Sequence, residues 1–147
     1  MANALSREMF QFARTAKQLL NVPAQIASTA APMLTKVLRT QIDAGTDPYG
    51  KRQAPLAPST LAKGRRPPPL VATGASRDET RFKARPGAGV ALYLGGWLPL
   101  HQSATKYRPA RPVAPRGPLP PAWRKAIEEA AEKVLKRQRL KGLGRAV

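Results

Sequence analysis

The clearest hydrophobic pattern lies near the C-terminal end of the chain. Apolar residues there recur every three or four positions, which indicates an amphipathic helix. The stripe consists of Trp123, Ile127, Ala130, Ala131, Val134 and Leu135. Acidic residues lie toward its start and basic residues toward its end, which matches the helix dipole. We expect a helix over residues 120–141, beginning at Pro120 or Pro121 and ended by Gly142 or Gly144, with a tail at 142–147.

Helical spacing also marks residues 1–45. One segment runs from about Ser6, which can cap it, to Leu20, and residues 21–23 should break it. A second apolar stripe then extends from Ile26 to Ile42 until Gly45 stops it. Pro32 falls within this stripe. It either kinks the helix or marks its beginning, with residues 23–31 as a shorter preceding turn.

A period of two replaces the helical spacing between Thr80 and Leu94. Basic and apolar residues alternate before Pro86–Gly89, and apolar residues alternate after it, which is typical of a β-hairpin. The short apolar run Leu70–Thr73, ended by Gly74, belongs to the same β region over residues 70–100. The predicted fold class is α+β, with a small antiparallel sheet packed against the N-terminal helices and the C-terminal helix.

Two stretches are too rich in proline to be helices or central strands. Eleven of the 16 prolines fall within Pro55–Pro69 and Pro109–Pro121. We expect an extended loop over residues 46–69, with one helical turn near Ser59–Lys63, and a Pro-rich arm over residues 101–119. All 147 residues then form one domain. We further expect such arms to gain order by lying on neighbouring molecules, not on their own domain.

The charge is strongly basic. Lys and Arg number 26 against 8 acidic residues, which gives a net charge of +18 spread along the whole chain. Such an excess attracts nucleic acid, acidic membranes or acidic proteins. Aromatic residues are few and do not alternate with bases, so any DNA contact should be electrostatic and independent of sequence. Charged residues interrupt the apolar ones between Met1 and Leu20, and no apolar stretch there is long enough to span a bilayer, so no membrane partner is expected. The candidate contacts to DNA or to an acidic partner are Lys63, Arg65, Arg66, Arg108, Arg116, Lys136, Arg137, Arg139 and Lys141.

The residues of a catalytic or metal site are missing. The chain has no cysteine and one histidine, His101, so neither a zinc site nor a supported nucleophile–histidine pair can be assembled. We expect no enzyme activity, no metal and no cofactor. His101 ends the apolar segment Trp97–Leu100, and its side chain is expected to be hydrogen-bonded to the backbone.

Five short motifs occur in order along the middle of the chain. They are carried by Asp47, Pro48, Gly50, Pro55, Leu56, Thr60, Leu70, Gly74, His101, Gln102, Arg111, Pro112 and Trp123. In this order they resemble the phage virion morphogenesis, or tail-completion, family of Mu-like and related tailed phages. Three places depart from the family's pattern: residue 53 is Gln near a usual Trp, Val113 replaces a usual Phe, and Gly95-Gly96-Trp97 stands where a Tyr-Ala step before the His is expected.

The resemblance implies a structural protein of the phage neck or tail end. Such a subunit would assemble with its own copies into a ring, most simply a hexamer, and contact portal-side, neck or tail proteins. It would be made in the host cytoplasm and reside in the virion, with non-specific contact to phage DNA. Two alternatives stay open: a sequence-independent nucleic-acid-binding protein outside phages, and a capsid-associated decoration or stabilising protein.

Overall fold

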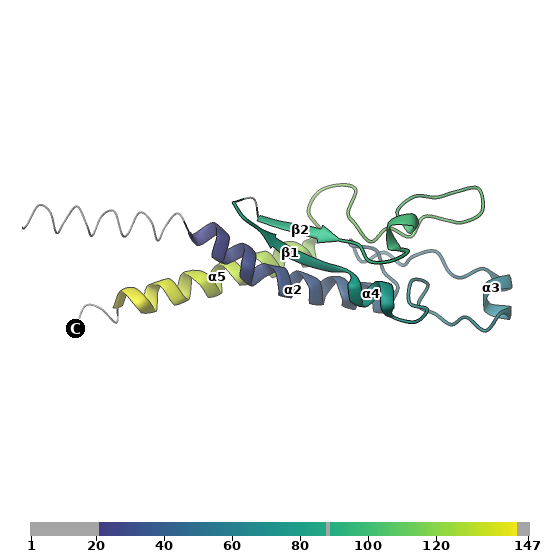
Figure 1. Ribbon diagram of the computed structural model, residues 1–147, viewed down its shortest axis with the longest axis horizontal. Coiled ribbons are helices and arrows are strands. Elements are labelled where there is room, and N and C mark those ends of the chain that lie inside the picture. The colour runs from purple at the N-terminus through teal and green to yellow at the C-terminus, as the bar shows by residue number, and fades with distance from the viewer. Residues whose placement is uncertain (1–20, 88, 144–147) are drawn as a thin grey trace, which may run out of the picture.

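Two long antiparallel helices form the body of the protein, and a β-hairpin packs along one of them (Figure 1). The computed structural model describes residues 21–87 and 89–143. Helix α2 spans Val22–Ala44 and helix α5 spans Pro121–Leu143. Side-chain hydrogen bonds join them near both ends: Trp123 Nε1 donates to Gln41 Oε1, and Gln138 Nε2 donates to Gln25 Oε1, each across 2.9 Å. The fold is α+β, as predicted.

Helix α2 is continuous through Pro32. Its first turn contains Pro23, and its C-terminus is closed by Gly45, which has a left-handed φ of 66° and is followed by a Thr46 N–H that donates to the Gln41 carbonyl. Residues 22 and 23 therefore begin this helix, and the alternative in which it starts near Pro32 is wrong. Burial of one face against α5 and the hairpin offsets the hydrogen bond that Pro32 removes. The helix predicted from Ser6 to Leu20 lies outside the described residues.

Small side chains separate the two helices where they run together. Ala27, Ala30 and Ala31 on α2 and Ala126 and Ala130 on α5 are all buried, which lets the backbones approach closely. Toward the other end the core widens around larger residues. These are Leu34, Leu38, Ile42, Leu70, Leu98, Val113 and Trp123. The predicted α5 stripe is therefore correct at most positions, although Leu135 is exposed and Ala126 belongs to the buried face.

The hairpin consists of β1, Arg81–Arg85, and β2, Gly89–Tyr93, as the alternating pattern predicts. Arg81 lies opposite Tyr93 and Phe82 opposite Leu92. The Phe82 N–H donates to Thr35 Oγ1 on α2 across 2.9 Å, so β1 is the strand whose outer edge meets the helix. The Phe82 ring also meets the Trp123 ring edge-on, with centroids 5.0 Å apart.

Three short helices lie in the connections. Helix α3, Pro58–Ala62, confirms the predicted turn; α4 spans Ala75–Glu79, and the 3-10 helix η1 spans Leu98–His101. Leu70–Thr73 is not a strand: Leu70 is buried in the core, and the chain then turns at Gly74 into α4. The tail predicted from residue 142 is also wrong at its start, because α5 continues through Gly142 to Leu143.

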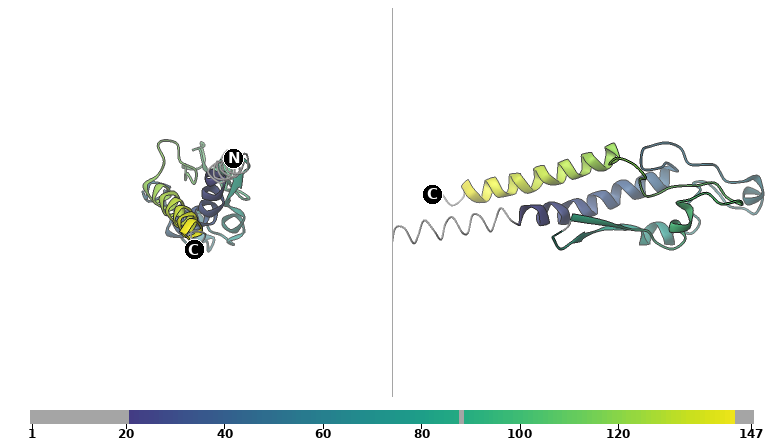
Figure 2. Two further views of the ribbon diagram at one scale, coloured as in Figure 1. Left: turned by 90° about the vertical axis from the view of Figure 1, so that its left-hand side faces the viewer. Right: turned by 90° about the horizontal axis from the view of Figure 1, so that it is seen from above.

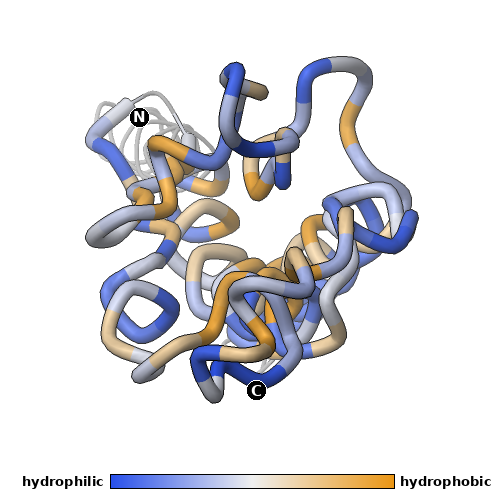
Figure 3. Tube along the Cα trace, turned by 90° about the vertical axis from the view of Figure 1, so that its right-hand side faces the viewer, coloured by the Kyte–Doolittle hydropathy of each residue, from blue (hydrophilic) through white to orange (hydrophobic). Residues whose placement is uncertain are grey.

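The connections gather at one end of the elongated body, and the C-terminus of α5 lies at the other (Figure 2). Viewed from the loop end, the peripheral loops are largely hydrophilic with a few apolar positions among them (Figure 3). Many large apolar side chains of the described residues are exposed, and others, such as Phe82, Leu92 and Ile127, are partly buried. Eight are buried (Leu34, Leu38, Ile42, Leu70, Leu98, Val113, Trp123, Val134), and nine are exposed (Tyr49, Leu61, Tyr93, Trp97, Leu100, Tyr107, Leu119, Leu135, Leu140).

Candidate functional site

The loop after α2 and the Pro-rich arm are fastened to each other. We call this contact, between residues 47–55 and 101–118, the buckle. Arg111 lies at its centre: its Nε donates to the Ala54 carbonyl across 2.8 Å and its Nη2 to the Pro55 carbonyl across 2.6 Å. Gln53 Nε2 donates to the Pro112 carbonyl across 3.1 Å. A guanidinium can bind two carbonyl oxygens at once, so one buried arginine holds two successive residues of the loop.

The arm is held from its own start as well. The Gln102 Oε1 atom accepts hydrogen bonds from the N–H groups of Val113 and Ala114, at 3.1 and 2.9 Å. The Arg111 N–H donates to the His101 carbonyl across 2.7 Å. These bonds turn the arm back so that the Val113 side chain enters the core, where it is only 2% exposed.

Tyr49 closes the far end of the buckle. Its hydroxyl donates to the Pro118 carbonyl across 2.8 Å and accepts from the Gly117 N–H across 3.0 Å. Asp47 shapes the turn that presents Tyr49, because its Oδ1 atom accepts from the N–H groups of Tyr49 and Lys51. We expected the arm to lie on neighbouring molecules and not on its own domain. This expectation is wrong for residues 111–118, because their backbone groups form hydrogen bonds with side chains of the same molecule.

The motif residues behind the family resemblance fall into several groups. Five take part in the hydrogen bonds of the buckle: Pro55, His101, Gln102, Arg111 and Pro112. Asp47, Pro48 and Gly50 form the turn that presents Tyr49 to it. Leu70 and Trp123 belong to the core, Gly74, with φ of 84°, precedes α4, and Leu56 and Thr60 lie in the projecting loop around α3.

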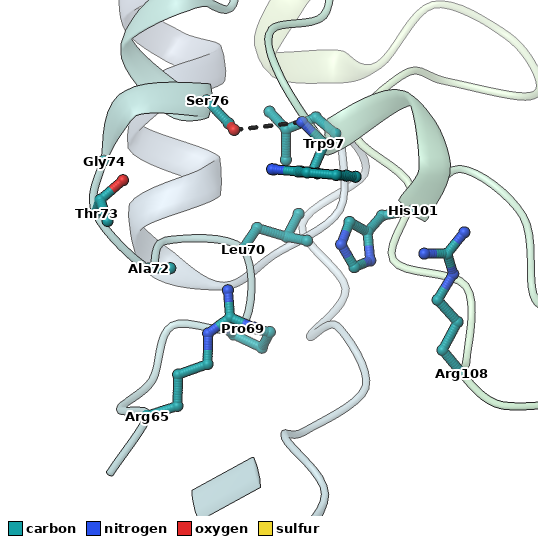
Figure 4. Close-up of a pocket in the computed structure, with 11 residues that line it drawn as sticks. Arg65, Pro69, Leu70, Ala72, Thr73, Gly74, Ser76, Trp97, His101 and Arg108 are labelled. Carbon is teal, nitrogen blue, oxygen red and sulfur yellow. Dashed lines mark hydrogen bonds between the residues drawn. The ribbon is translucent and has the colours of Figure 1, made fainter. Parts of the chain in front are cut away.

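A basic cavity lies beside the buckle, between the segment that leads into α4 and helix η1 (Figure 4). Its volume is about 480 Å³. Three basic side chains line it, those of Arg65, His101 and Arg108, together with the hydroxyl-bearing Thr73 and Ser76. Its apolar walls come from Pro69, Leu70, Ala72, Leu98 and Trp97. No acidic side chain lines this cavity.

His101 and Arg108 each present a buried polar atom without a hydrogen-bond partner in the described structure: His101 Nδ1 and Arg108 Nε. The expected hydrogen bond from the His101 side chain to the backbone is thus wrong for Nδ1. Burial lowers the pKa of His101, and the positive charges of Arg108, Arg111 and Arg65 lower it further. The imidazole is therefore neutral at pH 7, and one of the two nitrogens can accept or donate as a ligand requires.

The remaining candidate bases lie apart from the cavity. Lys63 and Arg66 are exposed on the loop after α3, and Arg116 donates to Ser103 Oγ across 2.9 Å. Lys136, Arg137, Arg139 and Lys141 are exposed along the last turns of α5, at the opposite end of the molecule. Among the described residues both ion pairs belong to Arg77, which bonds Asp43 and Asp78. Most of the positive charge is therefore free to meet a partner.

Between residues 21 and 143, apart from residue 88, no three His, Cys, Asp or Glu side chains lie close enough to hold a metal ion. None of the helices in this part of the chain combines the length and apolar character needed to cross a bilayer.

Comparison of the chain with protein-family models, with curated proteins and with solved structures found no match.

Proposed function

We propose that this chain is a non-enzymatic structural subunit of a tailed bacteriophage, which assembles with its own copies into a ring at the neck or tail end of the virion. The class rests on the motif resemblance. It is supported by five of the thirteen motif residues, which take part in the hydrogen bonds of the buckle, because a signature that maintains a fold is expected to converge in space. The ring itself needs a surface through which copies meet.

The outer edge of β2 supplies such a surface. In an antiparallel pair, hydrogen-bonded and non-hydrogen-bonded residue pairs alternate. The Phe82 N–H points to Thr35 on α2, so the pair Phe82–Leu92 is non-hydrogen-bonded, and the N–H and C=O groups of Leu92 point away from β1. By the same alternation Val90 also faces outward. Among the described residues neither backbone finds a partner on that side, and a two-stranded sheet is marginal alone.

Unpaired strand edges are templates for another strand, and native proteins usually cover or blunt them. The β2 sequence Gly-Val-Ala-Leu-Tyr carries no charge that would discourage pairing. This open edge is the observation that carries the assembly part of the proposal.

Native mass spectrometry of the full-length protein tests the proposal directly. The expected result is a discrete oligomer of the 15.9 kDa chain, with a hexamer as the simplest ring, visible as an annulus by negative-stain microscopy. Mass spectrometry of purified virions from the phage that carries the gene should then detect the chain. A protein that stays monomeric at all concentrations and is missing from virions would overturn the proposal.

Sequence-independent binding of nucleic acid is the second candidate, favoured by the unpaired bases at both ends of the body. It predicts binding of duplex DNA by the monomer, with affinity that falls steeply as salt is added. Strong duplex binding at physiological salt together with a monomeric mass would favour this function over ring assembly.

A further inference from the structure

The basic cavity has the features of a binding site that ring assembly does not require. Around one partly open cavity it combines two guanidinium groups, an imidazole and two hydroxyl groups. Figure 4 shows the guanidinium of Arg108 turned toward the imidazole of His101, with Arg65 on the opposite side of Leu70. Like charges that line one cavity repel each other, so this lining is stabilised when anionic groups enter the cavity.

Arg108 is free of the hydrogen bonds that hold the neighbouring Arg111. Arg111 Nε and Nη2 donate to carbonyl groups of the loop, whereas no hydrogen bond from the Arg108 side chain occurs among the described residues. Arg108 Nε and His101 Nδ1 are themselves solvent-inaccessible, so a ligand in the cavity would meet the terminal nitrogens of the Arg108 guanidinium.

The shape of the site favours a peptide over duplex DNA. Phosphates of a duplex lie on a convex surface and are met by exposed bases, whereas this cavity is recessed and has walls of Leu70, Leu98 and Pro69. Trp97 stands at the rim with most of its surface exposed. A short peptide can place a carboxylate among the bases and an apolar side chain against the indole.

The composition of the chain decides which partner can supply the carboxylates. Only 8 acidic residues accompany 26 basic ones, so copies of this chain cannot neutralise one another. We propose that the cavity lined by Arg65, His101 and Arg108 binds an acidic peptide segment of a different protein, with separate carboxylates bound by Arg65 and Arg108 and an apolar neighbour packed on Trp97. This site stands independently of ring formation, which is measured separately by native mass.

The test is a fluorescence titration of the full-length protein with the acetylated, amidated peptide EELEE. Trp97 is exposed at the site and Trp123 is 4% exposed in the core, so a spectral change on binding reports Trp97. The variants R65Q and R108Q should each weaken binding at least tenfold, the loss expected on removing a charge-assisted hydrogen bond. The matched controls R66Q and K106Q each remove an exposed basic side chain close in sequence to a lining residue. They should change the affinity for the peptide less than twofold.

Three results would overturn the inference. The wild-type protein could fail to bind the peptide, or could bind the uncharged peptide QQLQQ equally well. R65Q and R108Q could bind as well as R66Q and K106Q. Inorganic phosphate or a short duplex could bind with the same dependence on Arg65 and Arg108 while EELEE does not, which would assign the cavity to phosphate. If R108Q does not fold, the affinity of R65Q for EELEE tests the inference, because Arg65 is exposed on a loop and its replacement leaves the core intact.

Discussion

Gln53 donates a hydrogen bond from its side-chain amide to the carbonyl oxygen of Pro112, across 3.1 Å and 59 residues of sequence. The next residue, Val113, fills a buried position of the core. Gln53 and Val113 are two of the three places where the chain departs from the pattern of the family it resembles. The structure brings these two to one contact, where a hydrogen bond and an aliphatic side chain join the loop to the arm.

Arg111 should be the residue of the buckle on which stability depends most. Its guanidinium is 7% exposed and binds two carbonyl groups, so R111A should lower the free energy of unfolding by about 2 kcal/mol. R111K should lower the free energy of unfolding by a smaller amount, because a lysine ammonium group cannot donate to two carbonyl oxygens in the fixed planar geometry of a guanidinium. Urea unfolding followed by circular dichroism measures both. The control R116A, at an exposed arginine of the same arm, should change stability by less than about 0.5 kcal/mol.

Deletion of residues 109–118 should unfold the isolated protein, because it removes Arg111 and Val113 together. This expectation reverses the one that follows from treating the arm as a segment held by neighbours. A cooperative thermal transition retained by the deletion variant would show that the buckle contributes little to the fold.

Gly95 admits no side chain. A Cβ atom there would lie 2.4 Å from the Cβ of Glu79 and 2.6 Å from the carbonyl oxygen of Ser76. G95A should therefore displace α4 from the end of β2 at a cost of about 1–3 kcal/mol. At Gly64 no atom lies within 4 Å of the corresponding position, so G64A should cost only the positive-φ penalty of about 1 kcal/mol. Thermal unfolding of the two variants distinguishes crowding from backbone strain.

The Thr80 side chain forms hydrogen bonds both to helix α4 and to Gly95, which follows strand β2. Its hydroxyl donates to the Ser76 carbonyl and accepts from the Gly95 N–H, each across 2.8 Å, and the residue is fully buried. T80V keeps the shape but leaves the Gly95 N–H without its partner, which should cost about 1–3 kcal/mol. T80S keeps the hydroxyl and should recover most of the loss beyond the missing methyl group. Equal stability of T80V and T80S would contradict this role.

The stability of the protein should fall as the pH drops through the range where histidine titrates. The pKa of His101 is lower in the folded protein than in the unfolded chain, because burial and the charges of Arg108, Arg111 and Arg65 disfavour the imidazolium. The unfolded state therefore binds the proton more readily, and the stability present at pH 7 is lost progressively below about pH 6.5. H101Q should abolish this part of the pH dependence in thermal melts between pH 5 and 7.

The variant L92P should weaken oligomer formation while leaving the hydrogen bonds of the hairpin in place. The Leu92 N–H points away from β1, so L92P removes a donor from the open edge without removing a hydrogen bond of the hairpin. L92A is the matched control, since it loses the same packing but keeps the N–H. Native mass spectrometry should show fewer oligomers for L92P than for L92A. The same oligomer distribution in both would exclude this edge as the contact.

Sequence periodicity predicted helix α5 and the β-hairpin correctly, because each of these elements buries one face at regular intervals along the chain. The apolar stripe of α5 and the alternation around Pro86–Gly89 both gave the correct element, because one face of each packs against α2. The sequence pattern does not decide whether α2 continues through Pro32, because the local cost of a proline is offset by packing against segments far away in the sequence. Nothing in the local pattern of Leu70–Thr73 distinguishes a buried turn from a strand.

The buckle and the cavity were harder to predict because both are made by loops. The Arg111 contacts run from a side chain to backbone carbonyl groups, and any residue type can offer a carbonyl, so Ala54 and Pro55 carry no sequence signal. Arg65, Arg108 and His101 were each identified as candidate or motif residues. Their proximity depends on how two Pro-rich segments fold back, which neither composition nor spacing specifies.

The length of the helix pair has an electrostatic consequence. Lys136 is 15 residues beyond the start of α5, which places the basic turns of this helix more than about 20 Å from the cavity beyond its other end. The Debye length is about 8 Å at physiological ionic strength, so counter-ions screen the two ends from each other. Neutralising one end therefore leaves the potential at the other almost unchanged, and the rod can hold two acidic neighbours at once without either weakening the other.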